Sequence, residues 1–169
     1  MMERIPFGSI LALLTLVSML LFPVLLVLGV EVSWPKVTVP THVSWTIPVA
    51  LLAIFSHAII LFYFIGTGSR IKEVVKEFKL DVNLYRRTLA FKSRVFPLST
   101  LTMALIIAAT ILGGGAHTRF AWTPPLLHGV VAFGAAILNT ILSLREVACI
   151  SENLTLVDEV DQAVLSATR

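Results

Sequence analysis

Four long apolar runs dominate the pattern of this chain. Stretches without any Asp, Glu, Lys or Arg cover residues 7–30, 43–69, 95–118 and 120–144. Each exceeds the roughly 20 residues that an α-helix needs to cross about 30 Å of hydrocarbon. The pattern therefore predicts an all-α integral membrane protein, a single four-helix bundle whose transmembrane helices cover about 7–30, 46–68, 96–115 and 124–145.

Composition supports this class. The chain has 169 residues, of which 57% are hydrophobic and 14% are charged, and its mean hydropathy is +0.92. Soluble domains carry about 25% charged residues, so we expect the excess of apolar side chains to face lipid. The first run is longer than the apolar core of a secretory signal, about 7–15 residues, and no small-residue cleavage pattern follows it. We therefore expect this run to be retained as a helix.

Basic residues are concentrated between the second and third runs. Eight of the thirteen Lys and Arg residues lie in segment 69–94, whereas the two short loops hold only Lys36 and Arg119. The positive-inside bias predicts that this segment and both termini are cytoplasmic, in a multi-pass protein of a bacterial-type inner or plasma membrane. Six of its basic residues are expected to face lipid headgroups rather than a nucleic acid: Arg70, Lys72, Lys76, Lys79, Arg86 and Arg87. Three residues are expected to anchor the outer interface: Trp34, Trp45 and Trp122.

Two segments outside the spans also have helical patterns. In segment 69–94, Ile71, Val75 and Phe78 share one face and lysines occupy the other. This predicts an amphipathic helix on the inner membrane surface. The acidic tail 146–169 also repeats apolar residues at helical spacing. Because the tail and the basic segment have opposite charge, we expect the tail to dock on that segment or on a partner subunit.

Short motifs mark the expected ends of the helices. The second and fourth helices are each predicted to start with a threonine N-cap and a proline in the first turn, at Thr46 with Pro48 and at Thr123 with Pro124. The glycine run 113–115 is predicted to end the third helix, because glycine adopts the left-handed conformation of a C-cap. These motifs describe folding and carry no chemistry of their own.

Polar residues inside the apolar runs are the candidates for function, because a polar side chain in lipid needs a partner and normally faces the bundle interior. In the fourth run one face carries a stripe at spacings of three or four: His128, Ala132, Ala135, Asn139 and Ser143. The third run has a matching face: His117, Gly113, Ala109, Thr102 and Ser99. Because the connection between these runs is short, we expect His117 and His128 to lie close together at the outer end.

The histidines suggest two metal-containing sites. Two of His57, His117 and His128 would be axial ligands of haem b, since neutral imidazole is a common ligand of haem iron. His57 and His128, however, differ in depth by about 7 Å at about 1.5 Å per residue. His117 and His128 would bind a divalent metal with His42 as a third ligand, although metal sites usually have three or four protein ligands.

Two further interpretations need no metal. A quinone or a lipid headgroup would bind between His128, Asn139 and Tyr63, whose side chains can donate hydrogen bonds to a carbonyl oxygen. Alternatively, His57, His128 and Asn139 hydrogen-bond between helices and fix the packing of the bundle.

Three classes of function follow from these sites. The leading hypothesis is a small non-catalytic accessory or anchor subunit of a larger membrane complex, with a respiratory or electron-transfer complex as one candidate. Other membrane subunits or further copies of the chain are its expected partners. This hypothesis rests on the small size of the chain and on the lack of a catalytic constellation in the sequence. The alternative is a membrane redox protein that binds haem b or a quinone. A transporter or channel ranks third, because no charged residue interrupts the apolar runs.

Overall fold

The fold is all-helical. The structure, a computed structural model, describes residues 7–33, 37–118 and 124–168. Its helices are α1 (Phe7–Ser33), α2 (Val39–Glu77), α3 (Val82–His117) and α4 (Pro125–Ala167). All four are long and apolar enough to cross a membrane, which agrees with the predicted four-helix bundle.

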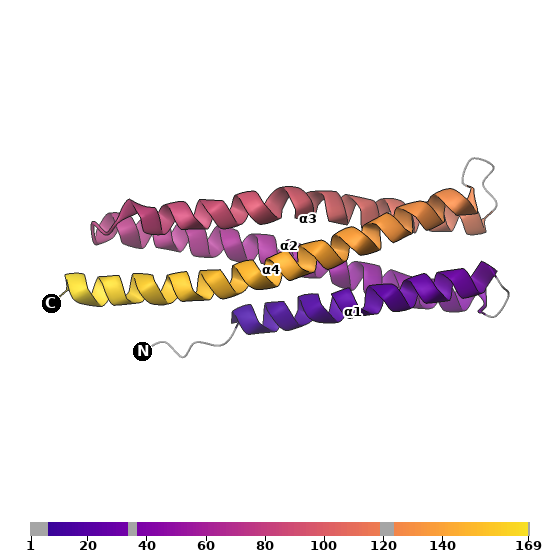
Figure 1. Cartoon of the computed structure of the whole chain (residues 1–169), viewed down its shortest axis with the longest axis horizontal. Helices are drawn as coiled ribbons and strands as arrows, with labels where there is room; N and C mark the ends of the chain where they lie inside the picture. Colours follow the sequence, from indigo (N-terminus) through magenta and orange to yellow (C-terminus); the bar gives the residue numbers. More distant parts are fainter. Residues whose placement is uncertain (1–6, 34–36, 119–123, 169) are drawn as a thin grey trace.

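The helices run side by side along one long axis (Figure 1). α1 packs against α2 and α4, α3 packs against the same two helices, and α2 also touches α4. The end of α1, the start of α2, the end of α3 and the start of α4 lie together at one end of the bundle, which we call the histidine end (Figure 1). The α2–α3 turn and the end of α4 lie at the other, which we call the basic end. α1 begins partway along the bundle, so the basic end contains three helices.

Apolar side chains cover the outside of the bundle. In the most apolar window of each helix, at most 39% of the residues are buried inside the protein. Large exposed residues such as Leu20, Phe62 and Leu126 point away from the core, with Phe62 72% and Leu126 79% exposed. A protein with a surface this apolar would aggregate in water, so the surface fits a lipid environment. The chain is therefore a multi-pass membrane protein.

The ends of the helices differ from those predicted. α2 begins at Val39, where the Thr38 hydroxyl accepts a hydrogen bond from the Thr41 amide at 3.3 Å. Thr46 is not an N-cap, since its hydroxyl bonds to the carbonyl of the preceding turn, and Pro48 lies inside the helix. Thr123 lies outside the described residues. The glycine run 113–115 does not end α3, which continues to His117.

The basic segment is not a separate surface helix. Its first part continues α2 to Glu77, and its second part belongs to α3. Between them the chain reverses at Lys79, whose φ of 52° is left-handed, and the Leu80 amide bonds to the Val75 carbonyl at 3.0 Å. Ile71 and Val75 are buried in the core. The apolar face of this segment is therefore covered by neighbouring helices of the bundle.

The acidic tail docks on the basic segment. It continues α4 without a break, and two bidentate ion pairs join it to α3. Arg94 donates to Glu152 at 2.8 and 3.2 Å, and Arg87 donates to both carboxylate oxygens of Glu159. The hydrogen bonds from Arg87 lower the pKa of Glu159 below its ordinary value. Of the two docking sites expected for the tail, the structure shows the basic segment.

The predicted interface anchors fall mostly outside the structure. Trp34 and Trp122 are not among the described residues. Trp45 is 58% exposed on the first turns of α2, near the histidine end. A half-exposed indole at this level fits the interface position that the sequence predicts.

Two apolar clusters divide the core along its length. One lies toward the histidine end and contains Phe22, Ala53, Ile106 and Ala135. The other extends toward the basic end and contains Leu11, Ile60, Val95 and Leu156, one from each helix. Most of the fully buried polar residues lie near the junction of these two clusters: Thr15 and Ser18 on α1, Ser56 and His57 on α2, Ser99 and Thr102 on α3, and Asn139, Ser143 and Glu146 on α4. These groups form one polar layer across the bundle, whereas Thr88 and Asn153 lie nearer the basic end.

Candidate functional site

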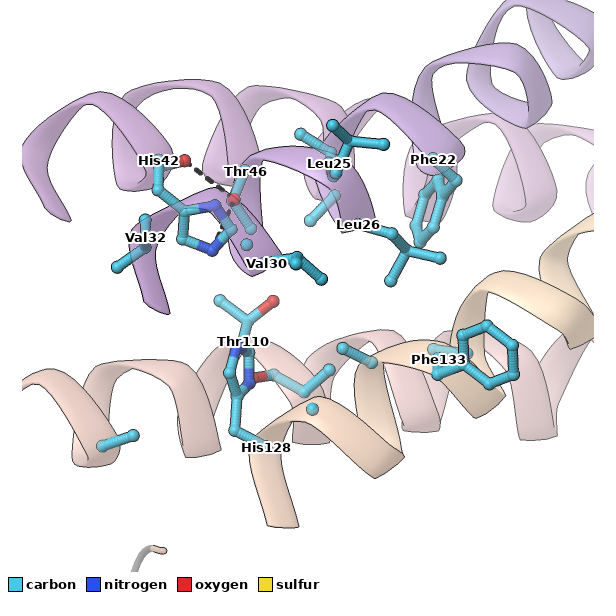
Figure 2. A pocket seen from close by; sticks show the side chains of 18 of the residues that line it. Phe22, Leu25, Leu26, Val30, Val32, His42, Thr46, Thr110, His128 and Phe133 are labelled. Carbon is cyan, nitrogen blue, oxygen red and sulfur yellow. Dashed lines mark hydrogen bonds between the residues drawn. The ribbon is translucent and has the colours of Figure 1, made fainter. Parts of the chain in front are cut away.

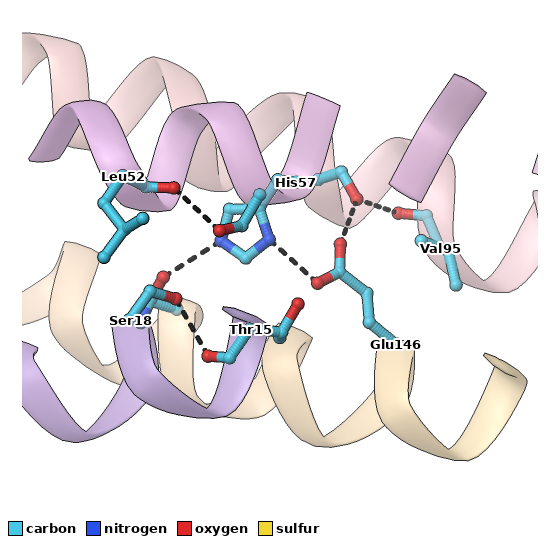
Figure 3. Close-up of polar contacts among 9 residues, drawn as sticks. Thr15, Ser18, Leu52, His57, Val95 and Glu146 are labelled. Atoms are coloured by element: carbon cyan, nitrogen blue, oxygen red, sulfur yellow. Dashed lines mark hydrogen bonds and ion pairs between the residues drawn. The ribbon is translucent and has the colours of Figure 1, made fainter. Parts of the chain in front are cut away.

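The polar layer is centred on His57, which bridges two residues of α4 (Figure 3). Its Nδ1 lies 2.8 Å from Oε2 of Glu146, and its Nε2 lies 2.9 Å from Oδ1 of Asn139. The Ser99 hydroxyl on α3 lies 3.3 Å from Oε1 of Glu146 and 3.0 Å from the Val95 carbonyl oxygen, so these two acceptors share its single proton. All four side chains are fully buried. We call this group the His57 network.

The hydrogen bonds define how many protons the His57 network holds. In the orientation shown, the amide oxygen of Asn139 faces Nε2 of His57 and only accepts, so Nε2 carries a proton in this arrangement. A second proton lies between Nδ1 and the carboxylate of Glu146, because two bare acceptors would repel at 2.8 Å. The pair is neutral as a unit, either as imidazolium with carboxylate or as imidazole with carboxylic acid. A neutral pair is the form that a low-dielectric interior accepts most readily.

Further hydroxyl groups surround the network. α1 contributes Thr15 and Ser18, whose hydroxyl donates to the Thr15 carbonyl at 2.9 Å (Figure 3). Buried polar atoms without a hydrogen-bond partner include the hydroxyl oxygens of Thr15, Thr102 and Ser143 and the amide nitrogen of Asn139. An unpartnered polar group in a membrane interior costs several kcal/mol, about 2–7 on transfer scales. Because several such groups lie in one layer, this layer is a candidate functional site.

Glu146 was missed as a site residue. Its position, two residues beyond the fourth apolar run, assigns it to the start of the acidic tail, and transport ranked last because no charge lies within the runs. The structure instead buries its carboxylate beside His57. A signal for it was present, because the polar stripe of α4 reaches Glu146 three residues after Ser143. Helical spacing therefore identifies this residue where the charge-free run ends too early.

A second feature, the histidine cavity, lies at the histidine end of the bundle. Its volume is about 750 Å³. Figure 2 shows Phe22, Leu25 and His42 on the side formed by α1 and α2, opposite His128 and Phe133 on α4. Most of its wall is apolar, and its polar lining is Glu31, His42, Thr46, Thr110, His117 and His128. A volume in the range of about 300–1,000 Å³ with a few convergent polar groups is typical of a small-molecule site.

Three histidines surround the histidine cavity. The ring centroids of His117 and His128 are 6.5 Å apart, and those of His42 and His117 are 6.0 Å apart. The predicted proximity of His117 and His128 is therefore present, and His42 joins them from the first turns of α2. Within the described part of the chain, however, no three His, Cys, Asp or Glu side chains are placed to hold a metal ion.

Local hydrogen bonds fix the proton on two of these rings. Nδ1 of His128 lies 3.0 Å from the carbonyl oxygen of Ala109, an acceptor, so Nδ1 carries the proton and Nε2 has a lone pair. The Thr46 hydroxyl already donates to the His42 carbonyl at 2.8 Å, so it accepts from Nε2 of His42 at 3.4 Å. Nδ1 of His42 is then the bare nitrogen, and it is buried without a partner. Each neutral ring therefore offers one acceptor.

Glycines make room for both rings. A Cβ on Gly113 would lie 2.9 Å from Cε1 of His128, and one on Gly29 would lie 3.3 Å from Cε1 of His42. The first distance is shorter than side chains tolerate. Gly113 is thus required for the position of His128, which explains a glycine within the helical part of α3.

The remaining predicted site residues lie apart from the histidine cavity. Tyr63 is nearer the basic end, where its hydroxyl accepts a hydrogen bond from Asn153 at 2.9 Å. Asn139 belongs to the His57 network. The expected site between His128, Asn139 and Tyr63 is therefore divided among three levels of the bundle. Both ring nitrogens of His57 have partners, so neither is free to bind haem iron.

Comparisons with protein-family models, curated proteins and solved structures find no match for this chain.

Proposed function

We propose that the chain is a membrane-embedded binding protein for a quinone-type ligand, held in the histidine cavity. The observation that carries this proposal is an apolar cavity of about 750 Å³ whose polar groups converge at one end. A ring with an isoprenoid-like tail matches the apolar wall, and its oxygen substituents match the histidines. This is the quinone form of the redox alternative drawn from the sequence.

The tautomers of the histidines favour the reduced ligand. Nδ1 of His42 and Nε2 of His128 are acceptors, whereas a quinone carbonyl needs a donor. A quinol has hydroxyl groups that donate to such nitrogens. We therefore infer that the site binds the quinol form more tightly than the quinone form.

The accessory-subunit hypothesis stays a prediction. It concerns the assembly in which the chain works, and a ligand site of this kind is compatible with a subunit of a larger complex. The cytoplasmic position of the basic end is likewise proposed, on the strength of the positive-inside bias.

Binding of short-tailed ubiquinol and menaquinol analogues tests the proposed function. The full chain in lipid nanodiscs should bind them saturably, beyond the uptake of empty nanodiscs. His128→Leu should weaken binding about tenfold, which corresponds to about 1.4 kcal/mol for one lost hydrogen bond. Val130→Leu, on the lipid-facing side of the same helix, should have no effect. Uptake that does not saturate, or a haem absorption band in the purified protein, would contradict the proposal.

A further inference from the structure

The His57 network has chemistry that ligand binding in the histidine cavity does not use. It places a fully buried carboxylate against a fully buried imidazole inside an apolar bundle. In a membrane interior such residues commonly mark a path or a store for ions or protons. Replacing the pair by apolar side chains would fill the same space without the cost of desolvation.

We propose that His57, Glu146 and Asn139 form an internal proton-binding site that takes up and releases one proton at Nε2 of His57. In the protonated state Nε2–H donates to Asn139, and the second proton lies between Nδ1 and Glu146. On release, the N–H bond at Nε2 breaks, its electron pair stays on the ring, and the proton passes to water. The ring keeps its proton on Nδ1 and donates it to the carboxylate.

Asn139 lets the network accept either state. Its Oδ1 accepts from Nε2–H, while its Nδ2 has no partner. When Nε2 loses its proton, rotation of the amide by 180° brings Nδ2 to the ring as a donor. Both states of His57 are thus hydrogen-bonded on this side, so neither leaves the ring nitrogen unsatisfied.

The Ser99 hydroxyl stabilises the carboxylate that remains after release, because it lies 3.3 Å from Oε1 of Glu146. Its proton is shared with the Val95 carbonyl oxygen at 3.0 Å, and after release the charged carboxylate is the stronger of the two acceptors. The buried hydroxyls of Thr15, Thr102 and Ser143 in the same layer form no hydrogen bond.

Other titratable groups of the described chain lie on both sides of the network. On the histidine side His42, His117 and His128 line the histidine cavity, and none of them is hydrogen-bonded to His57 or Glu146. The remaining groups near the network lie on its basic side. Cys149, one turn after Glu146, is buried. Arg145 is exposed, and Arg94 is paired with Glu152. Apart from His57 itself, no acidic or basic side chain of α1 or α2, in their described parts, is hydrogen-bonded to the pair. The charge state of the site therefore depends on His57 and Glu146 themselves.

The two residues of α4 that bind His57 lie on opposite sides of it along the bundle axis. α4 runs from the histidine end to the basic end, so Asn139 faces the histidine end and Glu146 faces the basic end (Figure 1). Ala135, in the wall of the histidine cavity, lies one helical turn before Asn139. We infer that the proton leaves His57 toward this cavity, whether or not a ligand occupies it.

Nitrogen-15 NMR of the histidine rings tests the proposal directly. In the full chain, labelled at histidine and assigned with His57→Gln, the Nε2 signal of His57 should move from protonated to bare as pH rises. Glu146→Gln should lower the midpoint by about 1–3 pH units, because a neighbouring negative charge favours the protonated ring. A His57 signal that stays constant over the whole pH range in which the protein is folded would overturn the proposal.

A milder variant keeps the test decisive if Glu146→Gln does not fold. Ser99→Ala removes one hydrogen bond to the carboxylate and leaves the pair in place, so the midpoint should rise by about one pH unit. Ser93→Ala, an exposed serine on the same helix, is the matched control and should leave the midpoint unchanged. Equal midpoints in both serine variants would contradict a proton site that includes Glu146.

Discussion

The imidazole of His57 lies 2.8 Å from the carboxylate of Glu146, although 89 positions separate the two residues in the sequence. The contact joins α2 to α4 inside the bundle, and both side chains are fully buried. Each partner removes the cost of burying the other. The stability of the bundle should therefore depend on the pair as a unit rather than on either residue alone.

Removing one partner should destabilise the protein more than removing both. Glu146→Leu leaves the imidazole without its carboxylate and should cost about 3–5 kcal/mol of unfolding free energy. The double variant with His57→Leu replaces the pair by apolar side chains and should recover most of this loss. Reversible unfolding of the purified chain in detergent or bicelles measures both effects.

An exposed ion pair gives the control for this comparison. Glu152 pairs with Arg94 where both side chains are about half exposed to the surroundings, at 49% and 48%. Glu152→Gln should change the unfolding free energy by only about 0–1 kcal/mol. Additive effects of the two single substitutions at His57 and Glu146 would argue against a coupled pair.

A methyl group at Gly113 should disturb the histidine cavity. Gly113→Ala places Cβ at 2.9 Å from the ring of His128, so the ring must shift and its bond to the Ala109 carbonyl must weaken. Affinity for a quinol analogue should then fall about tenfold, as expected for one lost hydrogen bond. Equilibrium binding in nanodiscs gives the measurement.

The next residue provides a matched control. A Cβ on Gly114 meets no atom within 4 Å. Gly114→Ala makes the same chemical change in the same helix and should leave affinity unchanged. If both alanines weakened binding equally, the loss would come from the helix backbone and not from the position of His128.

The sequence predicts the four membrane-spanning helices well but not the contacts between polar residues at the centre of the bundle. Long apolar runs determine that α1 to α4 cross a membrane, because hydrocarbon thickness limits the length of any span. The stripe of α4 also predicts correctly that Asn139 and Ser143 are buried. The partner of His57 could not be predicted, because pairing between α2 and α4 depends on how far each helix slides past the other. Spacing along one helix carries no information about that offset.

Helix ends were less predictable for a related reason. Within lipid an α-helix satisfies its own backbone, so proline at 48 and glycines at 113–115 are tolerated inside α2 and α3. In soluble proteins the same residues commonly mark ends. At the basic end, α2 and α3 continue past the apolar runs because Ile71, Val75 and Phe91 extend the core there. Hydropathy alone predicts the part of a helix that crosses the membrane and not the full length of the helix.

Acid should weaken the contact between the tail and the basic segment. Arg87 lowers the pKa of Glu159 in the folded chain, so the ion pair contributes fully above the ordinary glutamate value of 4.5. The contribution is lost as pH falls from this value through the lowered pKa, because the protonated carboxyl no longer pairs with Arg87. Hydrogen exchange of residues 155–167, corrected for its intrinsic pH dependence, should rise relative to α2 over this interval.

Removing the positive charge of Arg87, or screening it with salt, distinguishes loss of this ion pair from general acid unfolding. Arg87→Gln should raise exchange in the tail at neutral pH and remove most of its additional rise in acid. High salt should act in the same direction on the exposed pair, since mobile ions screen it. A tail whose protection is the same in the wild-type and Arg87→Gln chains at neutral pH would show that the apolar contacts of α4 hold it alone.

The basic end should face the cytoplasm. Basic residues near the ends of spans are retained on that side during insertion, and eight of thirteen lie between the second and third apolar runs. Lys76→Cys and Thr118→Cys place exposed thiols at the basic and histidine ends, whereas the native Cys149 is buried. In intact cells a membrane-impermeant maleimide should label Thr118→Cys alone, and lysis should expose Lys76→Cys. Labelling of Lys76→Cys in intact cells would show that the orientation is opposite to the one predicted. The histidine cavity would then lie toward the cytoplasmic side.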